Sequence, residues 1–272
     1  MIRRTLGRTG WAVSEIACGT YRSFDQGGRG GQGRVDGLVR ANLELGVNLF
    51  DAAPMYGHAE RTLGAALNGI APGQTLESGG PIVATKVLQP DRAGAVKQIE
   101  RSFALLGRID LLQIHNMAGS RSMIFKAEGR IRATGLTHYD PGSFGEIEAA
   151  CKTGQADAIQ IPLNIIEREA ERRLLPLARD LNLGVLVMTP MQPIFRRGEL
   201  LGRLRKLDLA PYRQHGVSDP GSLCLKYLLS KHPDVVLLPA TSRPGRAASN
   251  AAVSGSPPLD ADALAQLERL VG

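Results

Sequence analysis

The chain has 272 residues, which is close to the ~250 that a closed (β/α)8 barrel requires. Its 43% hydrophobic and 22% charged residues are ordinary for a globular protein with a large core, and no stretch approaches the ~18 uninterrupted apolar residues that would span a bilayer. The net charge of +7 would suit a nucleic-acid-binding protein, but only 4% of the residues are aromatic and no dense basic block occurs. We therefore expect no nucleic-acid and no membrane partner, and an anionic cofactor as one use of the positive charge.

The cysteine content and the start of the chain bear on its compartment. Cys18, Cys151 and Cys224 lie far apart and form neither a metal-type pair nor a disulfide framework. The basic first nine residues are not followed by the apolar segment of a secretion signal. These observations predict a cytoplasmic protein with buried thiols and no metal site.

Two segments flank the first predicted buried strand, one before it and one after it. Residues 3–13 (RRTLGRTGWAV) predict a short hairpin that would cap the floor of a barrel. Residues 26–34 (QGGRGGQGR) are glycine-rich but lack the GK[ST] ending of a phosphate loop. We expect them to form a flexible connection.

Eight short apolar runs, dense in Ile, Val and Leu, recur along the chain with amphipathic helical patterns between them. Parallel strands that are buried on both faces have this composition, and eight strands alternating with helices close a barrel. The sequence therefore predicts an α/β fold, a (β/α)8 TIM barrel in a single domain over residues 1–272. A doubly wound open sheet is the alternative, weakened by the absence of GxGxxG after the first strand. The runs are residues 15–19, 48–53, 82–87, 109–115, 131–136, 158–162, 184–189 and 235–239.

Helix punctuation supports this alternation. Asp140-Pro141 predicts an N-cap followed by proline in the first turn, and residues 218–220 do the same for a later helix. Residues 257–272 predict a final amphipathic helix capped by Asp260. Helices are expected to stop at Gly46, Gly107 and Gly154.

Polar side chains lie at the ends of three neighbouring predicted strands. Asp51 ends one strand and Tyr56 follows it, while Lys86 and His115 end the next two. Each has a structural explanation when taken singly, such as an ion pair, a cap or core packing. Because the carboxyl ends of barrel strands face the active site, the four together predict one proton-handling unit, with Asp51 and Lys86 as a buried pair.

At these residues the chain resembles the aldo-keto reductase family. The stretch 46–67 (GVNLFDAAPMYGHAERTLGAAL) is similar to the strand-two signature of the family, which includes D-x-A-x-x-Y-G. The lysine and histidine motifs resemble residues 84–87 (ATKV) and 109–116 (IDLLQIHN). Further similar stretches, at correct spacing over nearly the whole chain, are residues 129–137, 167–191 and 238–250.

The resemblance implies a mechanism for these residues. Hydride would pass from NADPH to a carbonyl carbon, and Tyr56 would give the oxygen its proton. A free phenol has a pKa near ~10, which Lys86, held charged by Asp51, is expected to lower. His115 would orient the carbonyl by hydrogen bonding.

The resemblance also implies a cofactor site with NADPH favoured and NADH left open. Arg246 and Asn250 match family positions for phosphate and adenine, and Arg243 could add charge to a phosphate site. A capped helix with solvated arginines is the structural alternative for this segment. Gln160 matches the carboxamide ligand. The cofactor-binding set is completed by Gly19, Thr20, Thr137, His138, Thr189, Met191, Thr241 and Ser242.

Several positions depart from the family pattern. Thr137-His138 replaces a Ser-Asn pair, Met188 replaces an aromatic residue, and Ala240 and Ser249 replace a lysine and an acidic residue. Only residues 117–126 are available for a fourth helix, which predicts one or two turns or a loose connection. Tyr21 and Asn116 are expected in the substrate pocket, although Tyr21 could equally pack.

Two other functions remain open. A cofactor-bound regulatory subunit with little turnover could use the same fold. A sugar-phosphate isomerase would need glycine-rich phosphate loops after strands seven and eight, and residues 189–191 and 240–242 lack them. The sequence predicts neither the physiological substrate nor the oligomeric state.

Overall fold

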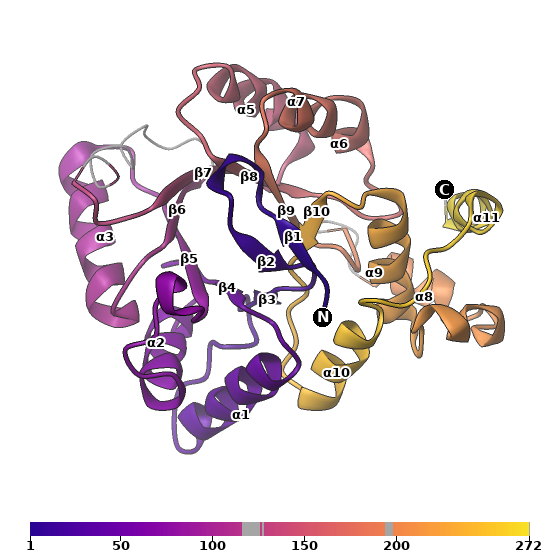
Figure 1. The fold of residues 1–272 in the computed structure, drawn as a ribbon, viewed down its shortest axis with the longest axis horizontal. Coiled ribbons are helices and arrows are strands. Elements are labelled where there is room, and N and C mark those ends of the chain that lie inside the picture. Colours follow the sequence, from indigo (N-terminus) through magenta and orange to yellow (C-terminus); the bar gives the residue numbers. More distant parts are fainter. Residues whose placement is uncertain (116–125, 127, 194–197, 272) are drawn as a thin grey trace.

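The computed structural model describes residues 1–115, 126, 128–193 and 198–271. Strands lie at the centre with helices around them (Figure 1). Eight parallel strands pair in sequential order, as a barrel requires. They are β3 (Cys18–Gly19), β4 (Leu49–Asp51), β5 (Ile82–Val87), β6 (Leu111–His115), β7 (Ala133–Thr137), β8 (Ala158–Pro162), β9 (Gly184–Met188) and β10 (Val235–Leu237).

The sheet closes where the first strand meets the last. Parallel bridges join Ile16 to Leu237 and Gly19 to Ala240, and the Gly19 N–H donates to the Pro239 carbonyl at 3.0 Å. A Cβ on Gly19 would lie 2.9 Å from the Leu238 carbonyl oxygen, so only glycine allows this approach. The predicted (β/α)8 barrel is confirmed.

The short hairpin of β1 (Arg3–Thr5) and β2 (Ala12–Ser14) covers the amino-terminal end of the barrel. Leu6, between the two strands, is 1% exposed and belongs to the core inside the barrel. A Cβ on Gly184 at the start of β9 would lie 2.5 Å from the Leu6 side chain. Burial of one leucine contributes about 1.5–3 kcal/mol, so the hairpin closes the floor as the sequence predicted.

Helices surround the strands, and a second core layer fills the space between them. The predicted N-caps are present. Asp140 and Asp219 accept backbone N–H groups at the starts of their helices, and Asp260 accepts the Ala263 N–H at 2.8 Å. No helix within the described residues is long and apolar enough to cross a membrane. The helices are α1 (Gly31–Glu44), α2 (Ala59–Ile70), α3 (Arg92–Leu106), α5 (Phe144–Cys151), α6 (Glu169–Arg172), α7 (Leu174–Asp180), α8 (Glu199–Leu204), α9 (Pro220–Lys231), α10 (Pro244–Ala252) and α11 (Ala261–Val271), with short 3-10 turns η1 (Gly7–Thr9), η2 (Leu76–Ser78), η3 (Pro141–Ser143) and η4 (Ala210–His215).

One predicted connection is partly wrong. The glycine-rich segment 26–34 was expected to be a loop, but α1 begins inside it at Gly31. The helix extends back from a buried face that includes Val35, Leu38 and Val39, and this tertiary packing outweighs the poor helix propensity of glycine. The predicted fourth helix, residues 117–126, lies outside the described residues except for Lys126.

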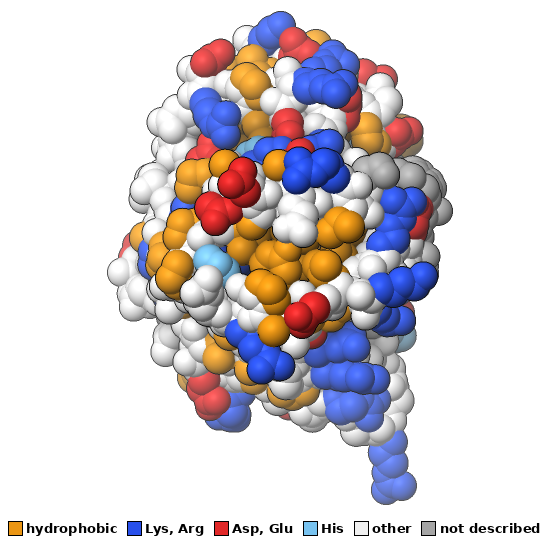
Figure 2. Space-filling model, turned by 90° about the vertical axis from the view of Figure 1, so that its right-hand side faces the viewer, with side chains coloured by type: hydrophobic (Ala, Val, Ile, Leu, Met, Phe, Trp, Pro, Cys, Tyr) orange, Lys and Arg blue, Asp and Glu red, His pale blue; other side chains and the backbone are white. Residues whose placement is uncertain are grey.

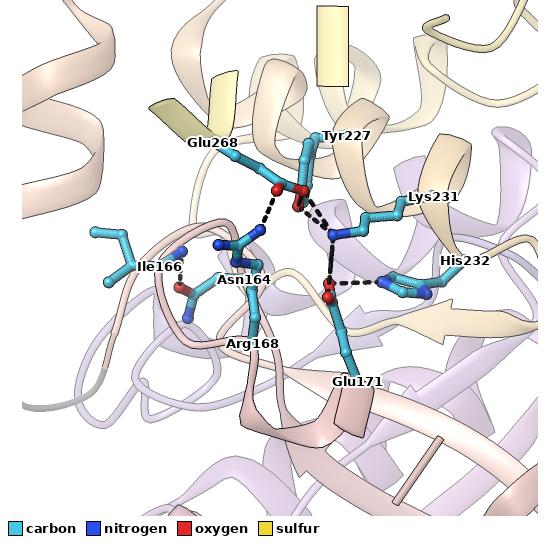
Figure 3. Close-up of polar contacts among 8 residues, drawn as sticks. All are labelled: Asn164, Ile166, Arg168, Glu171, Tyr227, Lys231, His232 and Glu268. Carbon is cyan, nitrogen blue, oxygen red and sulfur yellow. Dashed lines mark hydrogen bonds and ion pairs between the residues drawn. The ribbon is translucent and has the colours of Figure 1, made fainter. Parts of the chain in front are cut away.

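A polar cluster holds the final helix against the barrel, and we call it the helix clamp (Figure 3). Glu268 of α11 accepts hydrogen bonds from the Tyr227 hydroxyl and the Lys231 ammonium of α9, both at 2.6 Å. Lys231 also pairs with Glu171 of α6 at 3.0 Å. The clamp consists of Arg168, Glu171, Tyr227, Lys231, His232 and Glu268.

The face that carries α8 and α11 presents hydrophobic side chains at its centre, with basic side chains around them (Figure 2). Leu270 of α11 is 50% exposed.

Candidate active site

The barrel brings the predicted polar residues to the carboxyl ends of adjacent strands. Asp51 is the last residue of β4 and His115 the last of β6, with Lys86 on β5 between them. His115 pairs in register with Thr137 of β7, which in turn pairs with Gln160 of β8. Five neighbouring strands therefore contribute side chains to the end of the barrel where enzymes of this architecture hold their sites.

A buried ion pair forms the base of this site. The Lys86 ammonium, 1% exposed, lies 2.6 Å from Asp51 Oδ2 and 2.9 Å from the Ala52 carbonyl oxygen. Asp51 also accepts hydrogen bonds from the Gln113 and Gln160 side-chain amides, at 2.9 and 3.2 Å. Burial is the largest single effect and lowers the pKa of Lys86, but the charges of Asp51 and Tyr56 and the hydrogen bonds with both together outweigh it, and the net shift is upward. The lysine therefore stays charged.

Tyr56 lies above this ammonium. Its backbone N–H donates to the Ala53 carbonyl at 3.0 Å, which forms the turn between β4 and α2. The Lys86 nitrogen is 5.1 Å from the centroid of the Tyr56 ring. This turn places the phenol directly beside a fixed positive charge.

The pKa of Tyr56 is raised, which corrects the expected net direction. Burial raises it most, the charge of Lys86 lowers it, and Asp51 raises it again. Lys86 thus acts in the predicted sense but is outweighed. The phenol keeps its proton at neutral pH, as a proton donor must, and Lys86 favours the phenolate once the proton has left.

His115 is neutral in this environment. Burial lowers its pKa to about 4, and the charges of Lys86 and His138 act in the same direction. Its Nδ1 is buried and has no hydrogen-bond partner within the described residues. A neutral imidazole at this position can hydrogen-bond a polar group of a ligand without adding charge.

Two further buried polar atoms at the strand ends lack partners in the part of the chain that the structure describes. They are Thr137 Oγ1 and Gln160 Oε1, on strands that pair with each other. Buried polar atoms without partners cost about 1–3 kcal/mol each. A hydroxyl and an amide oxygen fit the carboxamide of a nicotinamide ring, which offers both an acceptor and donors.

His138 is the other residue predicted to bind the cofactor after β7, and its ring nitrogens already have hydrogen-bond partners within their own loop. Its Nδ1 accepts the Asp140 N–H at 3.0 Å, and its Nε2 lies 3.2 Å from Ser143 Oγ. Its ring also stacks on Tyr139. A contact with a cofactor would require His138 to exchange one of these partners.

The segment before α10 suits an anion. Arg243 and Arg246 are exposed, and neither side chain has a hydrogen-bond or acidic partner among the described residues. Thr241 Oγ1 accepts the Arg243 N–H at 3.2 Å, which shapes the turn with Ser242, and Asn250 is buried at 5% exposure. The amino terminus of a helix with two free guanidinium groups fits a phosphate.

Gly19, Thr20 and Tyr21 follow the first strand and lie near Asp51 and Tyr56. Thr20 Oγ1 donates to the Asp51 carbonyl at 2.9 Å, directly after Gly19. Tyr21, 47% exposed, packs edge-to-face on Tyr56 with ring centroids 5.0 Å apart. Asn116 lies outside the described residues.

The loop after β9 is strained at the predicted cofactor residue Thr189. Thr189 has a φ of +52°, and its Oγ1 is buried without a partner in the described ranges. Asn164, fully buried, donates to the Thr189 carbonyl at 3.3 Å and so holds the strained conformation. Met191 packs partly buried against the outer core.

Sequence reasoning missed Gln113 and Asn164. Gln113 lies two residues before His115 and therefore on the same face of β6. This period of two could have identified it as an inward-facing partner for Asp51. Asn164 gives no comparable signal, because its role depends on a carbonyl 25 residues away.

Comparisons with known proteins identify the family of this chain. The model of the Aldo/keto reductase family matches residues 15–271. The chain is 28% identical over 230 residues to the methylglyoxal reductase YeaE of Escherichia coli, covering 79% of this chain and 77% of that protein. It is 28% identical over 242 residues to the NADH-specific methylglyoxal reductase of the same organism, covering 76% and 71%.

A solved structure has the same fold. An aldo-keto reductase from Klebsiella pneumoniae in complex with NADPH superposes with a TM-score of 0.80 at 23% identity, over 100% of this chain and 96% of that one. The family match spans nearly the whole sequence, including every strand of the barrel. The chain belongs to the aldo/keto reductase family, a family of oxidoreductases.

Proposed function

We propose that this protein reduces an aldehyde or ketone to an alcohol with NADPH, and that Tyr56 donates the proton. The observation that carries the proposal is the Tyr56 phenol beside a buried ammonium, Lys86, whose charge is fixed by Asp51 at 2.6 Å. A group that must release a proton to a developing alkoxide needs such a neighbour. Residues 1–272 would act as one domain.

Each side chain has a separate role in the proposed reaction. Bound NADPH supplies the hydride for the carbonyl carbon. Tyr56 gives its proton to the carbonyl oxygen, and Lys86 stabilises the phenolate that remains. His115, neutral because burial depresses its pKa to about 4, hydrogen-bonds the same oxygen and orients it. Fixed groups of this kind stabilise charge that develops in the transition state without having to reorganise.

The cofactor preference rests on the segment before α10. Arg243 and Arg246 offer two exposed guanidinium groups, which suit the 2′-phosphate that distinguishes NADPH from NADH. The NADPH-bound Klebsiella pneumoniae structure supports this choice. One Escherichia coli relative is an NADH-specific methylglyoxal reductase, so the competing outcome is a preference for NADH.

The test is consumption of NADPH or NADH with a panel of aromatic aldehydes, methylglyoxal and ketones. We expect NADPH to be used with the lower KM. Tyr56→Phe should lower kcat by about 10²-fold or more because the proton donor is lost, while the dissociation constant for NADPH stays unchanged. Turnover of Tyr56→Phe at the wild-type rate refutes the role of Tyr56.

The same assay distinguishes a regulatory subunit. Such a protein would bind NADPH tightly yet oxidise it hardly at all with any carbonyl compound of the panel. Rapid oxidation with a reactive aldehyde supports the enzyme. Binding without turnover supports the regulatory alternative and contradicts the proposal.

A further inference from the structure

The turn that carries Tyr56 is held from outside by a residue of another loop. Asp25 lies between β3 and α1, far in sequence from the turn. One of its carboxylate oxygens, Oδ1, accepts the backbone N–H of His58 at 2.9 Å and also contacts the ring Nδ1 of His58 at 2.9 Å. The backbone hydrogen bond is the main reason that the pKa of Asp25 lies below its ordinary value. The carboxylate is therefore ionised at neutral pH, and both His58 atoms donate to it.

Gly57, the residue after Tyr56, lets the same carboxylate pack against the turn that carries Tyr56. Its φ is +61°, and a Cβ at this position would lie 2.2 Å from Asp25 Oδ1 and 2.3 Å from the carboxyl carbon. The carboxylate thus packs directly on the Cα of the residue that follows Tyr56. Gly27 also lies beside this contact, and a Cβ there would meet the His58 ring at an ordinary van der Waals distance of 3.4 Å.

The loop of Asp25 contacts the turn at a second point. Tyr21, on the same loop, packs edge-to-face on the Tyr56 ring. The Thr62 hydroxyl of α2 donates to the Phe24 carbonyl at 2.8 Å, which fixes the loop between these two contacts. Tyr56 is therefore restrained at its ring by Tyr21 and at its following backbone by Asp25.

Capping of α2 is the simplest alternative role for Asp25. His58 precedes α2 and makes no side-chain cap hydrogen bond to that helix, so the Asp25 carboxylate could serve as a cap supplied from outside. Asp25 and His58 are 47% and 50% exposed, and exposed ion pairs contribute little to stability. The two roles differ in what a substitution changes: a cap affects unfolding, whereas a positioning residue affects proton transfer.

We propose that Asp25 is a positioning residue that holds the Tyr56 phenol against Lys86 and couples this geometry to the loop that carries Tyr21. The inference rests on the proposed function. Asp25 touches the turn and not the reacting atoms, so its effect should appear in kcat and not in cofactor affinity.

The decisive variants are Asp25→Ala and Asp25→Asn. Asp25→Ala should lower kcat about ten- to a hundredfold, since misplacing a reacting group by about 1 Å costs on that order, with the dissociation constant for NADPH unchanged. Asp25→Asn keeps an oxygen that can accept from His58 and should recover most of kcat. In Asp25→Ala the basic limb of the kcat–pH profile should also move to higher pH, because the phenol loses part of its contact with Lys86.

Asp91→Ala is the matched control. Asp91 is an exposed aspartate on the connection between β5 and α3, where its Oδ1 accepts the Gly94 N–H at 2.9 Å and caps α3. Its loss should affect unfolding but leave kcat and its pH profile unchanged. An unchanged kcat in Asp25→Ala, or an equal loss in Asp91→Ala, overturns the proposal.

Hydrogen exchange supplies a readout that needs no turnover. Amides of residues 53–59 should exchange faster in Asp25→Ala than in the wild type, and at the wild-type rate in Asp91→Ala. If the wild-type protein reduced no carbonyl compound, the proposed function would fail while this experiment still decided the role of Asp25. Unchanged exchange in residues 53–59 of Asp25→Ala contradicts it.

Discussion

Two clusters in this molecule contain the same kinds of side chain, a carboxylate, a lysine, a tyrosine and a histidine. The strand-end cluster consists of Asp51, Tyr56, Lys86 and His115, and the helix clamp has its counterparts in Glu171, Glu268, Tyr227, Lys231 and His232. In the clamp the Tyr227 hydroxyl donates to a carboxylate at 2.6 Å. The Tyr227 hydroxyl also accepts a hydrogen bond from the Lys231 ammonium at 3.2 Å. The Tyr56 phenol likewise lies beside an ammonium, that of Lys86, but it donates to no carboxylate within the described residues.

This difference in partners changes the pKa of each tyrosine and the availability of each histidine. Burial raises the pKa of both tyrosines, but Glu268 raises that of Tyr227 further, whereas Lys86 lowers that of Tyr56. His232 is paired with Glu171 at 3.0 Å, while His115 Nδ1 has no partner within the described residues. Function follows from which polar groups are left available and which charge they face, and not from the residue types.

The largest expected effect comes from removing the charge beside Tyr56. Lys86→Met combined with Asp51→Asn leaves no unpaired buried charge, yet it deprives the phenolate of its stabilising neighbour. We expect kcat to fall by about 10²- to 10⁴-fold, measured as NADPH oxidation at saturating aldehyde.

The matched change in the helix clamp is Lys231→Met combined with Glu171→Gln. It removes the same two kinds of charge far from the strand ends and should leave kcat unchanged. An equal loss of kcat in both double variants would show that the two clusters do not differ in function.

A smaller effect, and one on stability alone, is expected for Glu268→Gln. Hydrogen bonds from Lys231, Tyr227 and Arg168 outweigh burial and lower the pKa of Glu268 to about 2. The folded-state pKa is thus depressed, so the stabilisation is complete above the ordinary carboxyl pKa and is lost as the pH falls towards 2. The variant should lower the free energy of unfolding by about 2 kcal/mol at neutral pH, measured by urea denaturation.

The same denaturation curves supply the control for Glu268→Gln. The difference from the wild type should shrink as the pH falls below about 4.5, because Glu268 then takes up a proton in the unfolded state, where its pKa is ordinary, while it is still ionised in the folded state. A constant difference down to pH 2, or a loss of kcat in the variant, would contradict the assigned role.

The smallest expected effect concerns the pH profile of kcat/KM, in which we expect no acidic limb caused by titration of His115. Because its pKa is lowered to about 4, the imidazole remains neutral as the pH falls from 7 to about 5. The kcat/KM for the aldehyde should therefore stay flat over this range. A limb near pH 6.5 that disappears in His115→Gln would show that His115 titrates as an ordinary histidine.

Local patterns in the sequence predicted much of the architecture. All six residues of β5 are buried, and the predicted run 82–87 coincides with it because a strand buried on both faces is predominantly apolar. The caps at Asp140 and Asp260 were equally predictable, since each satisfies N–H groups two or three residues away. The start of α1 at Gly31 was not, because packing of its buried face decided it.

The candidate site was predictable only as a set of residues. Their positions at successive strand ends placed Asp51, Tyr56 and Lys86 together, as the structure does. The net direction of the Tyr56 pKa depends on burial and could not be obtained from spacing.

The sequence by itself determined the order of strands and helices, the caps and the residue types at the strand ends, because each depends on neighbours within a few positions. Only the tertiary structure decided which charge each tyrosine faces, which polar atoms have no partner within the described residues, and that Asp25 reaches a turn 33 residues away. These properties depend on the distance and solvent exposure between segments far apart in the chain, and closure of the barrel sets both.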